Sequence, residues 1–391
     1  MDRTLSVAGS VALLERLVGF DTTSRDSNLD LIGFVRDWLA GHGVTSELVH
    51  DATGTKASLW ATIGPTDRGG IVLSGHTDVV PVDGQDWHTD PFRLTERDGL
   101  LYGRGTCDMK GFIACVLAAV PTLVARGPVE PVHIALSYDE EVGCLGVRPL
   151  LQHVIASHPR PRLCIVGEPT SMDVVDSHKG IRSFETIVTG REAHSSRPDK
   201  GVNAIVVMAG LVGFLQDLAA EMVARGDPSG RFEPAATTVG IGVIDGGSAT
   251  NIVARRCRLQ WEYRSLPTSD ADEIERRFRA HVEDVVLPDM RARAPEEAAV
   301  LTRIISEAPP LFARAGSEAE ALVKRLAQRN ETKAVAYVTE AGLFDQNEIP
   351  TIVCGPGDIA QAHRPDEFIP LEQMAACDAF LARLADVVCA P

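Results

Sequence analysis

The sequence is poor in basic residues relative to acidic ones. It has 38 Lys and Arg against 54 Asp and Glu, which gives a formal net charge of −16. Such an excess of negative charge repels polyanions, and the basic stripe that nucleic-acid-binding proteins need is missing. We therefore expect no nucleic-acid partner.

The sequence also lacks the pattern of an export signal or a membrane span. Its first twenty residues, MDRTLSVAGSVALLERLVGF, carry charges at helical spacing where a signal peptide needs an unbroken apolar segment. No stretch approaches the ~18 consecutive apolar residues that cross a bilayer. These absences predict a cytoplasmic protein without a membrane partner.

No two cysteines are spaced as a C-x-x-C pair. The eight cysteines are scattered, and several lie inside apolar segments, which is typical of buried thiols in a reducing compartment. Cys107 differs from the others because it lies within a glycine-flanked segment, GRGTCDMKG. We expect the cysteines to be free thiols.

The length of 391 residues predicts two domains, because one hydrophobic core rarely serves so long a chain. The first portion alternates segments of helical spacing, at 6–18 and 29–40, with short apolar runs at 71–75, 132–138 and 163–167. Continuous apolar strands among helices indicate a sheet covered on both faces. We expect an α/β fold class, with a mixed, mainly parallel sheet sandwiched by helices.

The pattern changes near residue 180 to strand, helix, strand, strand, helix and strand. The two helices are predicted at 201–224 and 269–286. This order is typical of the split βαβ arrangement and predicts an inserted α+β, ferredoxin-like domain. We therefore assign residues 1–180 and 309–391 to one domain and residues 181–308 to the insert.

Polar side chains follow each of the three apolar runs. His76 and Asp78 come after the first run, Glu140 and Glu141 after the second, and Glu168 after the third. In open α/β sheets, ligands bind in the crevice beyond the carboxyl ends of the strands. A metal-binding histidine usually donates its second ring N–H to a carboxylate or carbonyl, so Asp78 is a candidate to orient His76.

Two interpretations remain open for the acidic residues taken singly. Adjacent carboxylates such as Glu140 and Glu141 are favourable at a buried strand end if cations or protons neutralise them, but charge blocks also form solvated turns. Asp108, in a glycine-flanked loop before a predicted helix at 110–126, would serve either as a helix N-cap or as a bridge between two cations. The convergence of three strand ends on one crevice favours a metal site.

A later histidine, His363, completes the candidate ligand set. Two histidines with three or four carboxylates suit zinc, cobalt or manganese, and two such ions bridged by a carboxylate and a water form a hydrolytic centre. Because Glu140 and Glu141 are neighbours, one can bind metal while the other takes the proton from the bridging water. The sequence thus predicts a hydrolase with two divalent metal ions.

Several motifs, in order, resemble the acetylornithine deacetylase and succinyl-diaminopimelate desuccinylase group of metallopeptidases. The resemblance runs from about residue 70 to residue 370 and rests on SGHTDVVP, GRGTCDMKG, YDEEVGCLG, GEPT, GREAHSS, TEAGLF and CGPGDIAQAHRPDE. It implies a zinc-peptidase-like catalytic domain and a lid or dimerisation domain at 181–308. It also implies a small N-acyl amino acid as substrate and a homodimer that assembles through the insert.

The resemblance implies which side chains bind the two metal ions, most simply zinc, with cobalt or manganese as alternatives. His76 and Glu168 would bind the first ion, and Glu141 and His363 the second. Asp108 would bridge both ions.

The resemblance also implies catalytic and substrate-binding roles. Glu140 would be the general base, and Asp78 would orient the histidine of the first metal. His194 would reach across a dimer to stabilise the developing oxyanion, while Asn251 and Arg264 would hold the substrate carboxylate or acyl end. For the last three residues, an ordinary polar role within the insert is the alternative.

Within this group, VTEAGLF, GPGDIAQAHRPDEF and GEPTSMDVVDSHKG look closest to acetylornithine deacetylases. This implies hydrolysis of N2-acetyl-L-ornithine to L-ornithine and acetate in arginine biosynthesis, with Glu340 pairing with the substrate ammonium. Desuccinylation of succinyl-diaminopimelate, hydrolysis of other N-acyl amino acids and dipeptide cleavage are alternatives with the same chemistry. A metal-free binding or scaffold protein is the alternative from another class.

Overall fold

The computed structural model describes residues 7–390, which form two units. Unit 1 contains the described residues up to Ser177, Leu311–Ala334 and the residues from Thr339 onward, and unit 2 contains His178–Pro310 and Val335–Val338. Unit 2 therefore includes a short segment, Val335–Val338, that the sequence analysis assigned to the first domain.

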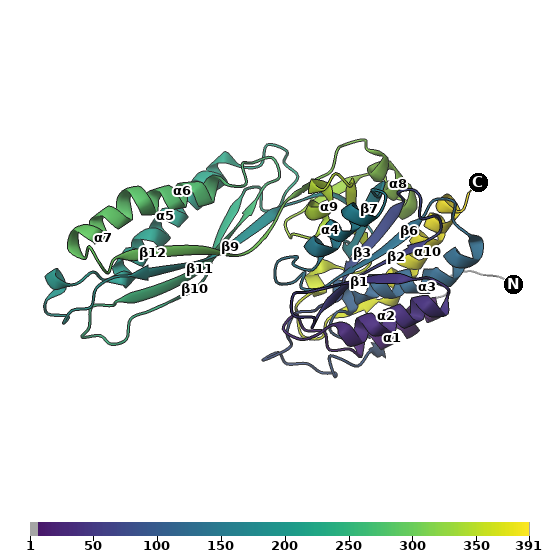
Figure 1. Cartoon of the computed structure of the whole chain (residues 1–391), viewed down its shortest axis with the longest axis horizontal. Coiled ribbons are helices and arrows are strands. Elements are labelled where there is room, and N and C mark those ends of the chain that lie inside the picture. Colours follow the sequence, from purple (N-terminus) through teal and green to yellow (C-terminus); the bar gives the residue numbers. More distant parts are fainter. Residues whose placement is uncertain (1–6, 391) are drawn as a thin grey trace. The chain divides into compact units, whose positions relative to one another are not determined.

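A mixed nine-stranded sheet forms the centre of unit 1 (Figure 1). Its order is β1-β2-β6-β3-β7-β15-β8-β13, and β14 pairs with β8. The parallel pairs lie in the middle of the sheet, among β6, β3, β7 and β15, whereas β1 and β2 pair antiparallel at one edge. The strands are β1 (Ser46–His50), β2 (Ala57–Ile63), β3 (Ile71–His76), β6 (Val132–Ser137), β7 (Leu163–Pro169), β8 (Val174–His178), β13 (Leu311–Phe312), β14 (Thr332–Val335) and β15 (Thr351–Gly355).

Helices cover both faces of this sheet (Figure 1). The helices that share the main core cluster on one face are α1 (Val7–Val18), α2 (Leu29–Gly41), α3 (Gly111–Arg126), α8 (Glu318–Ala327) and α10 (Leu371–Val388). The other face packs against α4 (Val147–Ser157) and α9 (Ala341–Gln346). Because both faces are covered, β3 and β6 are buried along their whole length, as their unbroken apolar sequences require. The predicted α/β fold class is confirmed.

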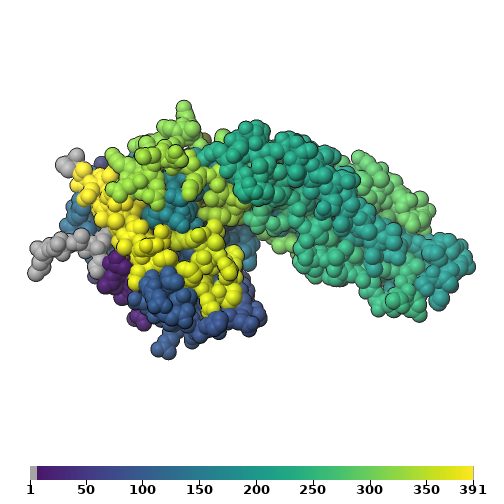
Figure 2. All heavy atoms as spheres, turned by 180° about the vertical axis from the view of Figure 1, so that it is seen from behind, coloured from purple at the N-terminus to yellow at the C-terminus, as the bar shows by residue number. Residues whose placement is uncertain are grey.

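A small antiparallel sheet brings the C-terminal part of the chain to the segment before Asp108. It consists of β16 (Phe368–Pro370), β5 (Leu100–Tyr102) and β4 (Thr95–Arg97). In Figure 2 the C-terminal atoms, in yellow, lie beside atoms of the early blue segments. This pairing places the loop of His363 near the loop of Asp108.

Unit 2 is built on a four-stranded antiparallel sheet in the order β10-β11-β9-β12. Its helices lie on one face of that sheet (Figure 1). The chain order is strand, helix, strand, strand, helix and strand, as the sequence predicted. The elements are β9 (Gly180–Thr189), α5 (Ala204–Arg225), β10 (Thr238–Gly246), β11 (Arg256–Ser265), α6 (Glu273–His281), α7 (Leu287–Arg293) and β12 (Ala299–Ala308).

Two helices correct the expectation that no segment is long and apolar enough to span a membrane. The helical segments Thr106–Arg126 and Ala204–Arg225 both meet that criterion by length and composition. The apolar window of the first is 78% buried, as in a core helix, whereas that of the second is only 28% buried. α5 therefore leaves much of its apolar surface outside the core of unit 2.

Candidate dinuclear metal centre

Three neighbouring strands of unit 1 end at one edge of the sheet with metal-ligating side chains. His76 is the last residue of β3, and Glu168 lies near the end of β7. Glu140 and Glu141 follow β6, which lies next to β3 on its other side. Because these strands are parallel, their carboxyl ends meet in the crevice that open α/β sheets use for ligands.

Five side chains at this edge form two groups that share Asp108. In the first group, His76 Nε2 lies 3.0 Å from Asp108 Oδ1 and 3.8 Å from Glu168 Oε1. In the second group, His363 Nε2 lies 3.0 Å from Glu141 Oε2 and 3.5 Å from Asp108 Oδ2. Within each group the ligand atoms all lie within 4.8 Å of one another. One oxygen of Asp108 thus faces each group, which is the arrangement of a carboxylate that bridges two cations.

The charges at this edge fit two cations. Burial, and after it the charge of Asp108, raises the pKa of Glu168 well above its usual value and also raises that of Glu141. Hydrogen bonds to Asp108 and Glu141 raise the pKa of His363 to about 10. Clustered carboxylates without counter-charges are unfavourable in a buried site, and divalent ions relieve that repulsion. The nitrogen and oxygen donors suit zinc-like ions.

Glu140 belongs to neither ligand group. Burial raises its pKa to about 8, and the nearby carboxylates of Glu141 and Asp108 add to this effect. Cys144 Sγ lies 3.4 Å from Glu140 Oε1. A carboxyl group beside the metal ligands, but not among them, is available to exchange a proton with substrate or water.

The contacts of Asp78 differ in part from those that the sequence predicted. His76 Nδ1 lies 2.9 Å from the backbone carbonyl oxygen of Asp78 and 3.6 Å from its carboxylate oxygen Oδ1, so the carbonyl is the closer partner of the ring. The carboxylate accepts hydrogen bonds from the backbone N–H groups of Glu140 and Glu141 and from the Ser24 hydroxyl. Asp78 therefore positions the loop of the two glutamates as well as His76.

The loop that carries Asp108 is held by a residue that the sequence analysis missed, Glu367. Its buried carboxylate accepts hydrogen bonds from the backbone N–H groups of Gly105, Cys107 and Asp108. Arg104 Nη1 lies 2.7 Å from Glu367 Oε2, and both side chains are 1% exposed. The only sequence signal was an acidic residue four positions after His363 in HRPDE.

Glu340 has partners other than the predicted substrate ammonium. It is 1% exposed, and its carboxylate accepts hydrogen bonds from the hydroxyls of Ser74 (2.6 Å) and Ser137 (2.8 Å). These serines lie on β3 and β6, the strands that deliver His76 and the two glutamates. In this structure Glu340 links the two strands through these hydrogen bonds, and the direct substrate contact stays a prediction.

The three remaining predicted residues all lie in unit 2. His194 and Asn251 come from adjacent loops, because His194 forms a β-bridge with Ile252 and the Ser195 N–H donates to the Asn251 carbonyl. His194 and Asn251 are exposed, and His194 Nδ1 lies 2.8 Å from the Ser196 hydroxyl. Arg264 lies on β11, where its Nε is 3.0 Å from Glu262 Oε1. Unit 2 therefore brings two of the three together.

All eight cysteines are free thiols. Cys107 is 1% exposed and its Sγ donates to the Asp358 carbonyl at 3.3 Å. Burial raises the pKa of the Cys107 thiol well above its usual value, which opposes formation of a reactive thiolate. Cys107 is therefore a buried, neutral side chain within the Asp108 loop.

Comparisons with known proteins agree with this geometry. The model of peptidase family M20/M25/M40 matches residues 72–387. An acetylornithine deacetylase of Pasteurella multocida is 36% identical over 93% of this chain and 92% of its own length. An acetylornithine deacetylase of Myxococcus xanthus is 36% identical over 97% of both chains.

A solved structure shows that the fold is shared as well. The M20 family metallo-carboxypeptidase of Sulfolobus solfataricus is similar with a TM-score of 0.76 and 16% identity, over 100% of both chains. The family model spans most of this sequence, including all five side chains of the two ligand groups. The chain therefore belongs to peptidase family M20/M25/M40.

Proposed function

We propose that this chain hydrolyses the amide bond of N2-acetyl-L-ornithine and releases L-ornithine and acetate, a reaction of arginine biosynthesis. The observation that carries the proposal is the pair of ligand groups that share Asp108, in a chain 36% identical to two acetylornithine deacetylases over more than nine-tenths of its length. The intact ligand set argues against a metal-free binding or scaffold protein.

The proposed metal centre uses His76, Glu168 and Asp108 for one ion and Asp108, Glu141 and His363 for the other. We propose zinc as the natural metal, with cobalt and manganese as ions that the same donors accept. When bound, the two ions would supply an activated water and positive charge for the amide carbonyl.

The protein side chains then have separable tasks. Glu140 takes the proton of the attacking water at a carboxylate oxygen and delivers it to the nitrogen of the leaving ornithine. Asp78 keeps His76 and the loop of Glu140 in place through the hydrogen bonds described above. This division requires Glu140 to be ionised before attack, which the charge of two nearby cations would favour.

Unit 2 is proposed to supply the remaining substrate contacts. His194 is proposed to donate to the oxygen of the tetrahedral intermediate, and Asn251 and Arg264 to hold the substrate carboxylate or acyl end. The exposure of His194 and Asn251, and the bridge between their loops, support a shared role at one surface of the unit.

We further propose that the protein is a cytoplasmic homodimer that assembles through unit 2. Unit 2 exposes large apolar side chains on α5 and on its sheet, and these are Val206 (66%), Val223 (65%), Ile244 (53%) and Leu301 (61%). Exposed apolar surface of this kind is typical of interaction sites, and most soluble oligomers are built from identical chains. Eight free thiols suit the reducing cytoplasm.

A substrate panel tests the proposed reaction. Zinc-loaded protein would be assayed with N2-acetylornithine, succinyl-diaminopimelate, acetylmethionine and a dipeptide, and kcat/KM compared. We expect the highest value for N2-acetylornithine. A higher value for another substrate would replace the proposed substrate but keep the metal-dependent amide hydrolysis.

The same panel separates two roles for Glu340. If it contacts the ornithine ammonium, Glu340→Gln lowers kcat/KM for N2-acetylornithine but not for acetylmethionine. If it only links β3 and β6, as its hydrogen bonds indicate, the variant lowers both values by a similar factor.

A further inference from the structure

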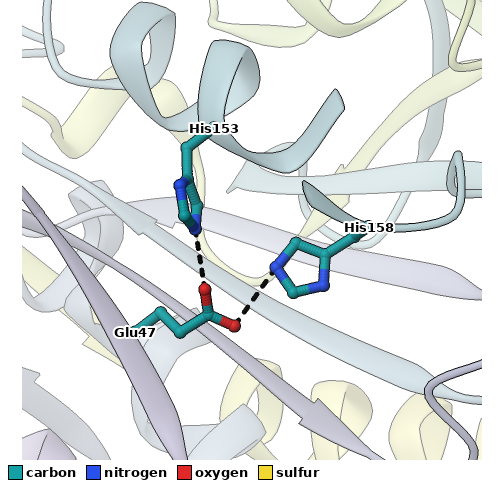
Figure 3. A group of neighbouring side chains, drawn as sticks. All are labelled: Glu47, His153 and His158. Atoms are coloured by element: carbon teal, nitrogen blue, oxygen red, sulfur yellow. Dashed lines mark hydrogen bonds and ion pairs between the residues drawn. The ribbon is translucent and has the colours of Figure 1, made fainter. Parts of the chain in front are cut away.

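A third group of metal-ligating side chains lies outside the dinuclear centre. It consists of Glu47 on β1, His153 on α4 and His158, the residue that caps the end of α4 (Figure 3). His153 Nε2 lies 2.7 Å from Glu47 Oε2, and His158 Nε2 lies 3.1 Å from Glu47 Oε1. The three ligand atoms lie within 4.8 Å of one another. Figure 3 shows both imidazole rings directed at the one carboxylate.

The fold places this group away from the ends of the strands that carry the dinuclear centre. β1 is the edge strand of the nine-stranded sheet and is separated from β3 by β2 and β6. α4 follows the carboxyl end of β6 and packs back along β6, β2 and β1, so its own C-terminus lies toward the amino end of β6. The two metal-ligating regions are therefore built at different places in unit 1.

Neighbouring aromatic rings hold one of the histidines. Glu47 pairs with Trp60 across β1 and β2, and the Trp60 ring lies 5.8 Å from the ring of His158. The other neighbour of Trp60 is His133, stacked at 4.7 Å. Trp60 is 1% exposed. This packing restricts the ring of His158 before any ligand binds, which lowers the entropy cost of coordination.

His158 Nε2 is also a buried atom that needs a partner. It lies near Glu47 Oε1 but outside hydrogen-bonding geometry, and no other atom of residues 7–390 forms a hydrogen bond with it. A cation between the two rings and the carboxylate would give this nitrogen a ligand bond.

We propose that Glu47, His153 and His158 bind one divalent cation of the zinc type. Two imidazole nitrogens and one carboxylate oxygen are a donor set that zinc accepts in proteins, with a fourth position left for water. Because the ligands come from an edge strand and the end of a helix, the cation clamps β1 to α4. Its role is structural, since no residue of the dinuclear centre belongs to this group.

Zinc content measured at equilibrium tests the proposal. Untagged full-length protein would be dialysed against one fixed free zinc concentration, and bound zinc per chain measured by plasma mass spectrometry. We expect His153→Ala and His158→Ala each to lose one equivalent of zinc per chain while kcat/KM stays within about twofold. Glu47→Gln is expected to lose the same equivalent of zinc. Because Glu47 is at an exposed strand position, this variant tests the site even if the histidine variants misfold.

The matched control is His50→Ala. His50 is exposed and lies on β1 three residues after Glu47. Its side chain therefore points to the face of the strand opposite that of Glu47. The His50→Ala variant should keep the full zinc content of the parent. Equal zinc content in the parent and in Glu47→Gln would overturn the proposal, and would leave the dinuclear centre and the proposed reaction untouched.

Thermal unfolding gives a second readout. A cation that binds only the folded chain stabilises it in proportion to the logarithm of its concentration. Zinc added beyond saturation of the dinuclear centre should raise the Tm of the parent and of His50→Ala, but not that of His153→Ala or His158→Ala. The same rise in all four proteins would contradict the proposed site.

Discussion

Units 1 and 2 use their sheets in opposite ways. The sheet of unit 1 is covered by helices on both faces and buries His76 and several carboxylates at the ends of its strands. The sheet of unit 2 has helices on one face and exposes apolar side chains such as Leu301 and Ile305. Unit 1 therefore buries a cluster of acidic side chains with His76, whereas unit 2 exposes apolar side chains on its sheet.

This contrast indicates a chemical site in unit 1 and an interaction surface in unit 2. Buried charges are costly unless they are paired, hydrogen-bonded or bound to cations, so their presence in unit 1 indicates a chemical site. Exposed apolar patches are costly in water, so their presence in unit 2 indicates a surface that contacts another molecule. Substitutions in the two units should consequently affect different measurements.

The largest effect is expected from Glu140→Gln in unit 1. This variant removes the proposed base but none of the ligands, so kcat should fall by about 10²–10⁴ while bound zinc stays unchanged. Steady-state kinetics and metal analysis on the same preparation would check it. Glu96→Gln, at an exposed position of β4, is the control. An unchanged kcat would remove Glu140 from the mechanism.

Glu367→Gln should be the most destabilising of these changes. It leaves the buried Arg104 charge without its partner, which typically costs about 3–5 kcal/mol of unfolding free energy. The loop of Asp108 should loosen as well, and zinc affinity should fall. Urea unfolding and zinc titration would measure both effects, with the exposed Glu372→Gln as control. Parent-like stability and zinc affinity would show that Glu367 does not hold this loop.

In unit 2, His194→Ala tests whether that unit takes part in the reaction. Loss of one oxyanion donor typically lowers kcat by about 10²–10³, and KM should change much less. Ser196→Ala, which removes only the hydroxyl beside Nδ1, should have a smaller effect. A change confined to KM would assign His194 to substrate binding instead.

The smallest effect on folding is expected from Leu301→Lys on the exposed sheet face of unit 2. The unfolding free energy should change by no more than about 0.5 kcal/mol, because Leu301 is 61% exposed. The charge should nevertheless weaken the proposed dimer, which light scattering coupled to gel filtration would detect. Val124→Lys, an exposed valine of unit 1, is the control. A parent-like mass for Leu301→Lys would place the interface elsewhere or exclude a dimer.

The α/β class and the strand, helix, strand order of the insert could be predicted because both depend on local patterns. Unbroken apolar runs at 71–75 and 132–138 indicate strands covered on both faces, and helical spacing is visible within a few turns. The polar residues that follow those runs could be predicted to meet, because parallel strands end at one edge of a sheet.

The partners of buried charges could not be predicted in the same way. Glu367 and Arg104 meet across more than 250 residues, and Glu340 finds two serines from separate strands. A free glutamate and a buried, hydrogen-bonded one have the same sequence signature. Only the burial and the hydrogen bonds seen in the tertiary structure distinguish the two.

The sequence by itself determined the order of the elements and the types of side chain that follow each strand, because local propensity and periodicity act over short distances. Only the tertiary structure decided that the oxygens of Asp108 face two separate groups and that Glu47 meets His153 of α4 and His158 at the end of that helix. The reason is physical: coordination and burial depend on distances in space between residues far apart in the chain, and no local pattern records those distances.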